Sequence, residues 1–352
     1  MKKTTKKTIL ALMVSVLSIG AFAGCGSNSK QAASQAETST TGSKADNSKL
    51  KEFRIGVPGQ DDSYIGGLFN VAYYEGYLKE ELNAVGYDPT LVAAISGPVL
   101  NESLAAKEID AAIYGDFPAF TAASNGLGNK IVAVVDSKYQ YAILASDKSS
   151  ISDPADLEGK TVSVTQGTVL QFFWEQYLKK NGIDSSKINI VNATDMATLF
   201  QTGDIDAGVT TISSAYYIEN SGVGAKIFDT GDLDAYTTLV ATVRGDILDE
   251  NPEVGVALNK ALIRAYDAVK QDVSILYKDQ ATPQMGEEIW EKTQSFDSSL
   301  DNLKVQITDD TLDFYNELDD WLVDNKVITN KVDVNDFVVT DYYDKAISEL
   351  GK

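Results

Sequence analysis

The 352-residue sequence predicts an α/β protein of two similar lobes, joined by two crossover strands and followed by a helical C-terminal tail. Three observations support this fold class. Short apolar strands alternate with helical stretches from Phe53 onward, a pattern typical of parallel sheets. A helix–turn–strand pattern recurs 96 residues further along the chain. The chain is also long enough for two domains with a sizeable core.

Residues 50–142 are predicted to form the first part of the first lobe. They begin with a strand, a helical region and a second strand. These elements cover residues 53–58, 66–83 and 91–95, in that order. A helix at 98–107 follows, with Pro98 at its first position, where proline is favoured. A third strand at 109–114 leads into the sequence GDFPA at 115–119.

A weak internal repeat relates this block to a second one. The IDA motif at 109–111 corresponds to the IDA motif at 205–207, and apolar helix positions before the two motifs also correspond. Each copy ends a comparable strand–helix–strand block, which favours duplication, although so short a motif also arises by chance. We interpret Asp110 and Asp206 as turn residues at a strand entry, not as ligand groups.

The second lobe is predicted at residues 143–238, and residues 239–352 are expected to complete the first lobe and form the C-terminal helices. Apolar crossovers and long helices mark these boundaries; the crossovers cover 139–145 and 238–243, and the helices cover 251–273 and 309–324.

Local start and stop signals organise the second lobe. Asp153 precedes a short predicted helix, and a buried strand is expected at 160–165. Thr168 is suited to cap the next helix, because its hydroxyl can accept a bond from a free backbone N–H. Gly182 is expected to end that helix, since glycine readily adopts the left-handed conformation.

Composition excludes many function classes. The chain has no histidine, so Ser-His-Asp and Cys-His catalysis and His-ligated metals are excluded. Its single cysteine excludes an internal disulfide and a cysteine-ligated zinc or iron–sulfur site. A net charge of −21 argues against nucleic acid as a partner. We therefore expect no metal and no cofactor.

The N-terminus predicts export. Lysines in the first seven residues precede an apolar run at 9–23, which is too short for a comfortable membrane span. We interpret residues 1–24 as a signal peptide and Cys25 as the lipid attachment point. The motif FAGC resembles the lipobox of bacterial lipoproteins, although Phe22 replaces the usual aliphatic residue. The alternative is a plain signal peptide with an incidental cysteine.

Residues 25–49 contain no large apolar side chain, and we predict a flexible tether. More than one acyl chain on Cys25 would give stable membrane anchoring. The expected location is the extracellular face of the cytoplasmic membrane, or the periplasmic side if the cell has an outer membrane.

The body from about Phe53 to Lys278 resembles the substrate-binding proteins of ABC importers, in the branch for aliphatic sulfonates, taurine and nitrate. The matching stretches are LAAKEIDAAIYGDFPAF, DPADLEGKTVSVTQGT, KKNGI and GDIDAGV, in that order and spacing. The resemblance implies a type II periplasmic-binding-protein-like fold that binds its ligand between the lobes. It also implies an ABC permease and ATPase as partners, and we expect a monomer.

We place the candidate ligand site in the loops at the carboxyl ends of the predicted strands, where ligands of open parallel sheets bind. Several of these loops begin helices, whose free backbone N–H groups attract anions. No lysine or arginine lies in them, so an anion would be held by dipoles and neutral donors. The candidate residues are Gln60, Asp61, Asp62, Ser63, Tyr64, Ser96, Gly97, Asp116, Phe117, Pro118, Tyr139, Gln166, Gly167, Thr168, Val169, Thr211 and Ser213.

The charge of the ligand is left open by these loops. Asp61, Asp62 and Asp116 can either cap turns or bind an amine, and a zwitterion such as taurine would satisfy both kinds of group. Related receptors often carry Trp-Asp-Pro after the fourth strand, where this chain has Thr-Ile-Ser at 211–213. This departure alters one wall of the expected cleft.

Three classes of function are compatible with the fold. A non-catalytic import receptor for a small organic anion or zwitterion is favoured, with nitrate or a thiamine precursor as alternative ligands. A surface sensor lipoprotein that is not coupled to import is the second class. An enzyme is disfavoured, because the related pyrimidine synthase of thiamine biosynthesis relies on a histidine and a cysteine-rich motif that this chain lacks.

Overall fold

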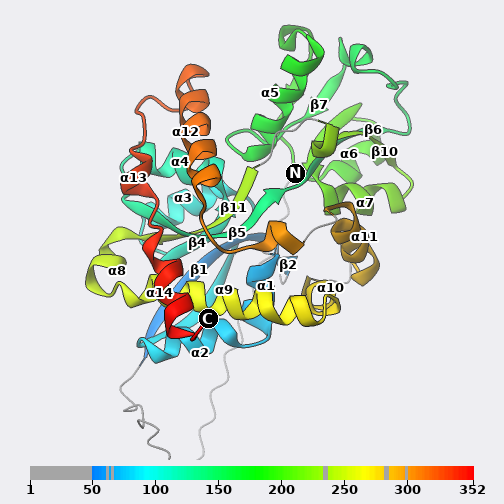
Figure 1. Ribbon diagram of the computed structural model, residues 1–352. Helices are drawn as coiled ribbons and strands as arrows, with labels where there is room; N and C mark the ends of the chain where they lie inside the picture. The colour runs from blue at the N-terminus through cyan, green and yellow to red at the C-terminus, as the bar shows by residue number, and fades with distance from the viewer. Residues whose placement is uncertain (1–49, 61–62, 65–66, 233–236, 281–284, 298–299) are drawn as a thin grey trace, which may run out of the picture. The chain divides into compact units, whose positions relative to one another are not determined.

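The computed structural model describes residues 50–60, 63–64, 67–232, 237–280, 285–297 and 300–352 (Figure 1). The predicted signal peptide, Cys25 and the tether lie outside these residues, as do Asp61 and Asp62. Within the described ranges, no helix combines the length and the apolar character that crossing a membrane requires.

The first sheet has the strand order β3-β1-β4-β11-β5, with the short strand β2 paired to β1. Strands β3, β1 and β4 are parallel, and β11 runs antiparallel to both β4 and β5. The strands are β1 (Lys51–Gln60), β2 (Ser63–Tyr64), β3 (Tyr87–Ala94), β4 (Ala111–Gly115), β5 (Asn129–Tyr139) and β11 (Thr237–Arg244).

The second sheet repeats this topology. Its order is β8-β7-β9-β6-β10, with β8, β7 and β9 parallel and β6 antiparallel to β9. The strands are β6 (Tyr141–Ser146), β7 (Thr161–Ser163), β8 (Asn189–Val191), β9 (Ala207–Thr211) and β10 (Gly224–Asp229). Each strand of the first sheet except β2 therefore has a counterpart in the second.

The internal repeat predicted from the sequence is confirmed. Strand β4 and the following helix α4 (Asp116–Ser124) lie 96 residues before β9 and α7 (Ile212–Asn220). The two strand-entry aspartates play the same part: Asp110 accepts the backbone N–H of Arg54, and Asp206 accepts that of Thr161, each at 2.9 Å. Both carboxylates thus join the repeated strand to its parallel neighbour.

The helices of the first lobe cover both faces of its sheet. One face packs against α1, α2 and α9, and the other against α3, α4 and α12. The helices are α1 (Leu68–Tyr74), α2 (Tyr77–Ala84), α3 (Gly97–Ala105), α8 (Gly245–Glu250), α9 (Glu253–Gln271), α10 (Ser274–Gln280), the 3-10 turn η4 (Leu300–Leu303), α12 (Asp309–Asp324), α13 (Val334–Phe337) and α14 (Asp341–Glu349).

Two expectations for this lobe were wrong in detail. The helical region at 66–83 is two helices, because the chain turns at Gly76, whose φ of 81° is left-handed. Pro98 is the second residue of α3 rather than the first, since Gly97 already belongs to the helix. Helix α12 begins and ends where the sequence predicted.

The second lobe follows its start and stop signals closely. Its helices are η1 (Pro154–Leu157), α5 (Val169–Asn181), η2 (Ser185–Lys187), α6 (Met196–Thr202) and α7, with η3 (Thr230–Asp232) before β11. Asp153 caps η1, Thr168 caps α5, and Gly182 ends α5 with a φ of 64°.

Residues 239–352 were expected to complete the first lobe and form the C-terminal helices. Helix α11 (Glu287–Asp297) differs from this expectation, because it packs on the second lobe. Ile289 belongs to the same apolar cluster as Ile212 and Ala215 of α7. The Lys292 ammonium lies 4.1 Å from the ring centre of Tyr216. Figure 1 shows α11 beside α7.

The chain passes from the first sheet to the second at Gln140, the residue between β5 and β6. The expected crossover at 139–145 is therefore a single junction residue followed by a strand of the second sheet. Thr230, which lies on the return path, donates its hydroxyl to the Gln140 side chain and accepts the backbone N–H of Tyr141 at 3.3 Å. Strand β11 lies within the first sheet.

Candidate ligand-binding site

A cavity of about 210 Å³ lies at the carboxyl ends of the parallel strands of both sheets. This is the position where open α/β sheets bind ligands. The residues that line it are Pro58, Ile95, Ser96, Gly97, Tyr114, Gly115, Pro118, Tyr139, Tyr141, Thr165, Thr168, Val169, Leu170, Ala193, Thr194, Met196, Val209, Thr210, Thr211, Ser214 and Leu239. We call it the interlobe cavity, because both lobes contribute to this lining.

Glycines on the first lobe make the wall of the interlobe cavity possible. A Cβ atom at Gly115 would lie 2.8 Å from Cγ1 of Val169, which belongs to the second lobe. A Cβ atom at Gly97 would lie 2.6 Å from Cγ of Pro118. Both positions therefore require glycine for the observed approach of α5 and α4 to the strand ends.

The second lobe lines the cavity with hydroxyl groups at two helix starts. The Thr168 hydroxyl accepts the N–H of Leu170 at 3.2 Å and donates to the carbonyl of Thr165 at 2.7 Å. The Thr211 hydroxyl accepts the N–H of Ser214 at 3.3 Å and begins α7 in the same way. Both helix N-termini therefore open toward the cavity, and part of their first N–H groups is already bonded: the caps take those of Leu170 and Ser214, and the Ile212 N–H donates to the Gln140 carbonyl at 3.0 Å.

Seven of the residues proposed from the sequence line the interlobe cavity: Ser96, Gly97, Pro118, Tyr139, Thr168, Val169 and Thr211. Gln166 is exposed and is absent from the lining, and the Gly167 N–H donates to the Gln171 side chain at 3.0 Å. The side chains of Gln60, Ser63 and Tyr64 lie outside the described residues, as do Asp61 and Asp62.

Asp116 and Phe117 do not line the cavity. The Asp116 carboxylate is fully buried and accepts the backbone N–H of Thr238 at 2.6 Å and its hydroxyl at 3.0 Å. It also accepts the N–H of Phe117 at 2.7 Å. Burial raises the pKa of Asp116 to about 7, against the hydrogen bonds that lower it. The carboxylate therefore holds β11 to α4 rather than facing a ligand.

The candidate residues do not include the segment between β8 and α6. Ala193, Thr194 and Met196 line the cavity, yet none was proposed. The repeat offers a signal for them, because an offset of 96 from the candidate Gly97 leads to Ala193. The repeat applied to the loops thus indicates Ala193, but not Thr194 or Met196.

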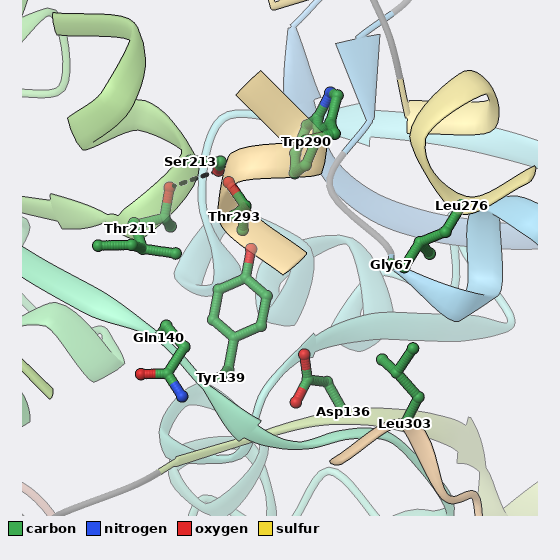
Figure 2. Close-up of a pocket in the computed structure, with 11 residues that line it drawn as sticks. Gly67, Asp136, Tyr139, Gln140, Thr211, Ser213, Leu276, Trp290, Thr293 and Leu303 are labelled. Atoms are coloured by element: carbon green, nitrogen blue, oxygen red, sulfur yellow. Dashed lines mark hydrogen bonds between the residues drawn. The ribbon is translucent and has the colours of Figure 1, made fainter. Parts of the chain in front are cut away.

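A second hollow of about 50 Å³ adjoins the interlobe cavity and shares Tyr139 and Thr211 with it. Its size suits one or two water molecules. Figure 2 shows the Tyr139 hydroxyl directed toward Thr293 of α11, with Trp290 beyond it. Ser213 lies here, and its hydroxyl is 3.2 Å from that of Thr211.

Two larger hollows, of about 520 and 710 Å³, share no lining residue with the interlobe cavity. The larger lies at the entry edge of the first sheet and is lined by charged side chains that pair with one another. Lys107 contacts Asp246 and Lys130 contacts Asp336, each at 2.8 Å. Such mutual pairing leaves little charge for a solute.

Helix α5 also holds the lobes together. The Phe172 ring is 7% exposed and belongs to an apolar cluster of the first lobe. It meets Trp321 of α12 edge-to-face, with 4.8 Å between the ring centres. Trp321 in turn lies 6.1 Å from the Phe117 ring. The helix that opens on the cavity is therefore the one that contacts the opposite lobe.

Duplicated sheets with a cavity at their carboxyl edges place the chain in the class of periplasmic-binding-protein-like folds. Residues 69–272 match the family model described as NMT1/THI5 like, and the chain belongs to this family.

Three similar proteins are named for sulfonate binding. A Bacillus subtilis (strain 168) protein, whose name assigns it to aliphatic sulfonate binding, is 26% identical and covers 96% of this chain and 97% of its own length. The sulfonate-binding protein SsuA of Methylobacillus flagellatus KT has a TM-score of 0.71 at 21% identity, covering 86% and 95% of the two chains. SsuA of Xanthomonas axonopodis pv. citri, bound to MOPS, has a TM-score of 0.70 at 18% identity, covering 83% and 99%.

The same fold carries other functions. The nitrate-binding protein NrtA of Synechocystis PCC 6803 has a TM-score of 0.67 at 14% identity, covering 86% of this chain and 89% of its own. A mutant of the desulfurization enzyme DSZB, in complex with biphenyl-2-sulfinic acid, has the same TM-score and identity, covering 85% of this chain and 100% of its own. Fold alone therefore does not determine the ligand or exclude catalysis.

We expect Phe172→Ala to separate the lobes without unfolding them. Losing the buried ring and its contact with Trp321 should destabilise the joined form by about 2 kcal/mol, a roughly thirtyfold shift in the population of separated lobes. Small-angle scattering should report a larger radius of gyration, with unchanged circular dichroism. Tyr74→Ala, which removes a surface aromatic that is 49% exposed, is the control. An unchanged radius would show that other contacts hold the lobes.

Asp116 should make stability depend on pH. Its folded pKa is about 7 against an ordinary value of 3.8, so the unfolded chain binds fewer protons between about pH 4 and 7. The free energy of unfolding should therefore fall as pH rises through this range. Urea unfolding should reveal a smaller decline for Asp116→Asn than for the wild type. Equal slopes in the two proteins would contradict the shifted pKa.

Proposed function

We propose that the chain is an extracytoplasmic solute-binding receptor of an ABC importer, which binds a small organic anion or zwitterion of the aliphatic sulfonate class. The ligand occupies the interlobe cavity and is delivered to a membrane permease. The observation that carries the proposal is the lining of this cavity: hydroxyls and helix N-termini, with no charged side chain among the described residues.

Neutral donors suffice to hold an anion in such a cavity. Helices α3, α5 and α7 all begin at lining residues, so their partial positive charge and the first-turn N–H groups that no cap uses face the same space. Each hydrogen bond to a charged group contributes roughly 1.5–3 kcal/mol. Four or five, less the cost of immobilising the ligand, reach the ~8 kcal/mol of a micromolar site.

Binding without turnover fits the chemistry of this lining. The chain has no histidine, and the described lining residues include no carboxylate, lysine or cysteine to act as base or nucleophile. Burial raises the pKa of the Tyr139 and Tyr141 hydroxyls well above the ordinary value, so both stay protonated near neutral pH. The tyrosines therefore serve as neutral walls and donors.

We also propose that a lipid on Cys25 attaches the chain to the membrane. The signal-like N-terminus and the FAGC motif support a lipid anchor on the outer face of the cytoplasmic membrane. From there the receptor would meet a permease and ATPase. The sulfonate-binding name of the Bacillus subtilis relative, which spans nearly the whole chain, supports the same role.

The ligand proposal predicts thermal stabilisation by sulfonates. An alkanesulfonate at a hundredfold excess over its Kd should add about 2.7 kcal/mol to the free energy of unfolding, raising Tm by several degrees. Thr168→Asp should abolish the shift, because aspartate still caps α5 but adds like charge beside the anion. Thr308→Asp, at the equivalent cap of α12, should keep it.

The outcomes separate the candidate functions. A Tm shift with no release of sulfite identifies a receptor, whereas release of sulfite would identify an enzyme. Absence of a shift with methanesulfonate, hexanesulfonate, taurine and nitrate would contradict the ligand class. An equal shift in Thr168→Asp would place the anion away from α5.

Cys25 is predicted to carry the lipid. Cells fed labelled palmitate should incorporate it into the wild-type chain and not into Cys25→Ser, which should appear in the medium instead. Ser27→Ala is the matched control and should remain lipidated and bound to the membrane. Label retained in Cys25→Ser would assign the acyl chain to another residue.

A further inference from the structure

We infer that helix α11 is a clasp: the segments before and after it are anchored on the first lobe, while the helix itself packs into the second lobe and holds the lobes together around a bound solute. The inference rests on the proposed function and assigns control of binding to an element outside the interlobe cavity. The path of the chain, the burial of Ile289 and the position of Trp290 support it.

The segments on either side of α11 belong to the first lobe. Leu276 of α10 and Leu303 of η4 are both buried, and both pack in the apolar cluster of the first lobe that includes α9. Just beyond η4, the Val305 carbonyl accepts the backbone N–H of Val134 on β5 at 3.4 Å. The chain therefore packs on the first lobe both before and after α11.

Helix α11 itself packs into the core of the second lobe. The Ile289 side chain is 7% exposed and lies in a cluster with Ile212, Ala215 and Tyr216 of α7. The other buried members of this cluster all come from residues 142–218, so Ile289 is the one member, within the described ranges, from outside the second lobe. Withdrawing this side chain would expose apolar surface of both partners to water, which is unfavourable.

The charged contact between α11 and α7 is weaker. The Lys292 ammonium lies 4.1 Å from the ring centre of Tyr216 and 4.0 Å from the Glu219 carboxylate. The Lys292 side chain is 50% exposed, and ion pairs that are open to water and salt stabilise little. We therefore expect Ile289 to carry most of the contact.

Trp290 lies at the point where α11 meets both lobes. Its side chain is buried and lines the small hollow beside the interlobe cavity (Figure 2). Leu276 and Leu303 of the first lobe border the same hollow, as do Ile212 and Ser213 of the second. Helix α11 thus occupies a space that both lobes border.

The helix that α11 contacts is tied to the junction between the lobes and to the interlobe cavity. The Ile212 N–H at the start of α7 donates to the carbonyl of Gln140, where the chain crosses between the sheets. Thr211, which caps α7, lines the interlobe cavity. Rotation of the lobes about this junction would carry α7 away from α11, whose neighbouring segments stay on the first lobe. The α11 contact therefore favours the joined arrangement that encloses a solute.

Distances between spin labels test the clasp without any ligand. Labels on Glu102→Cys and Lys179→Cys, at exposed positions of the first and second lobes, are introduced into the full chain with Cys25→Ser. Pulsed electron–electron double resonance should show the ratio of separated to joined lobes rising about tenfold in Ile289→Ala, because the buried side chain is truncated. Ile289→Leu, which conserves the apolar volume, should stay within about threefold of the wild type.

Ile247→Ala is the matched control, because Ile247 is 8% exposed in an apolar cluster of the first lobe alone. It should lower Tm and leave the distance distribution unchanged. An unchanged distribution in Ile289→Ala would overturn the inference, since α11 would then move with the second lobe. Equal separation in Ile247→Ala would also overturn it, because the opening would follow from a general loss of stability.

Calorimetric titration with methanesulfonate, hexanesulfonate and taurine links the clasp to binding. Ile289 does not line the interlobe cavity, yet Ile289→Ala should weaken the bound probes by up to about tenfold, because the joined fraction falls. Unchanged affinity would overturn the assigned control of binding. Failure of all three probes to bind the wild type would contradict the proposed function, whereas the ligand-free distances would still decide whether α11 is a clasp.

Discussion

Helix α5 is the element on which the candidate site depends. Its first residues, Thr168 and Val169, form a wall of the interlobe cavity, and Val169 reaches Gly115 of the opposite lobe. One turn later, Phe172 packs against Trp321. One short helix therefore supplies both a wall of the cavity and a contact with the opposite lobe.

The hydrogen-bond network at the start of β11 is the second constraint. Asp116 binds Thr238, whose hydroxyl also lies 2.8 Å from that of Tyr315 on α12. The neighbouring Thr237 donates to the Tyr141 hydroxyl at 2.7 Å, across to the second sheet. A buried carboxyl group with three donors thus holds the return strand to the start of α4, and Thr238 extends this network to α12. All the donors of Asp116 belong to the first lobe.

The net charge of −21 and the neutral cavity are compatible. Screening limits the field of surface charges to about 8 Å at physiological salt, whereas hydroxyls and helix N-termini act at contact distance. The surface acids and the neutral lining of the cavity therefore act over different ranges. The sign of the overall charge therefore carries no information about the charge of the solute.

Local signals in the sequence determined the repeated strand–helix units, the caps at Asp153 and Thr168, and the stop at Gly182, because each depends on bonds between near neighbours. Tertiary structure decided the rest. Asp116 was expected in the cleft, but in the structure it accepts a hydrogen bond from Thr238, 122 positions later in the chain. Met196 and Thr194 line the cavity because β8 pairs beside β7. Phe172 packs on the first lobe because Trp321 of α12 contacts its ring. These outcomes depend on which distant surfaces bury one another, and no local pattern encodes that choice.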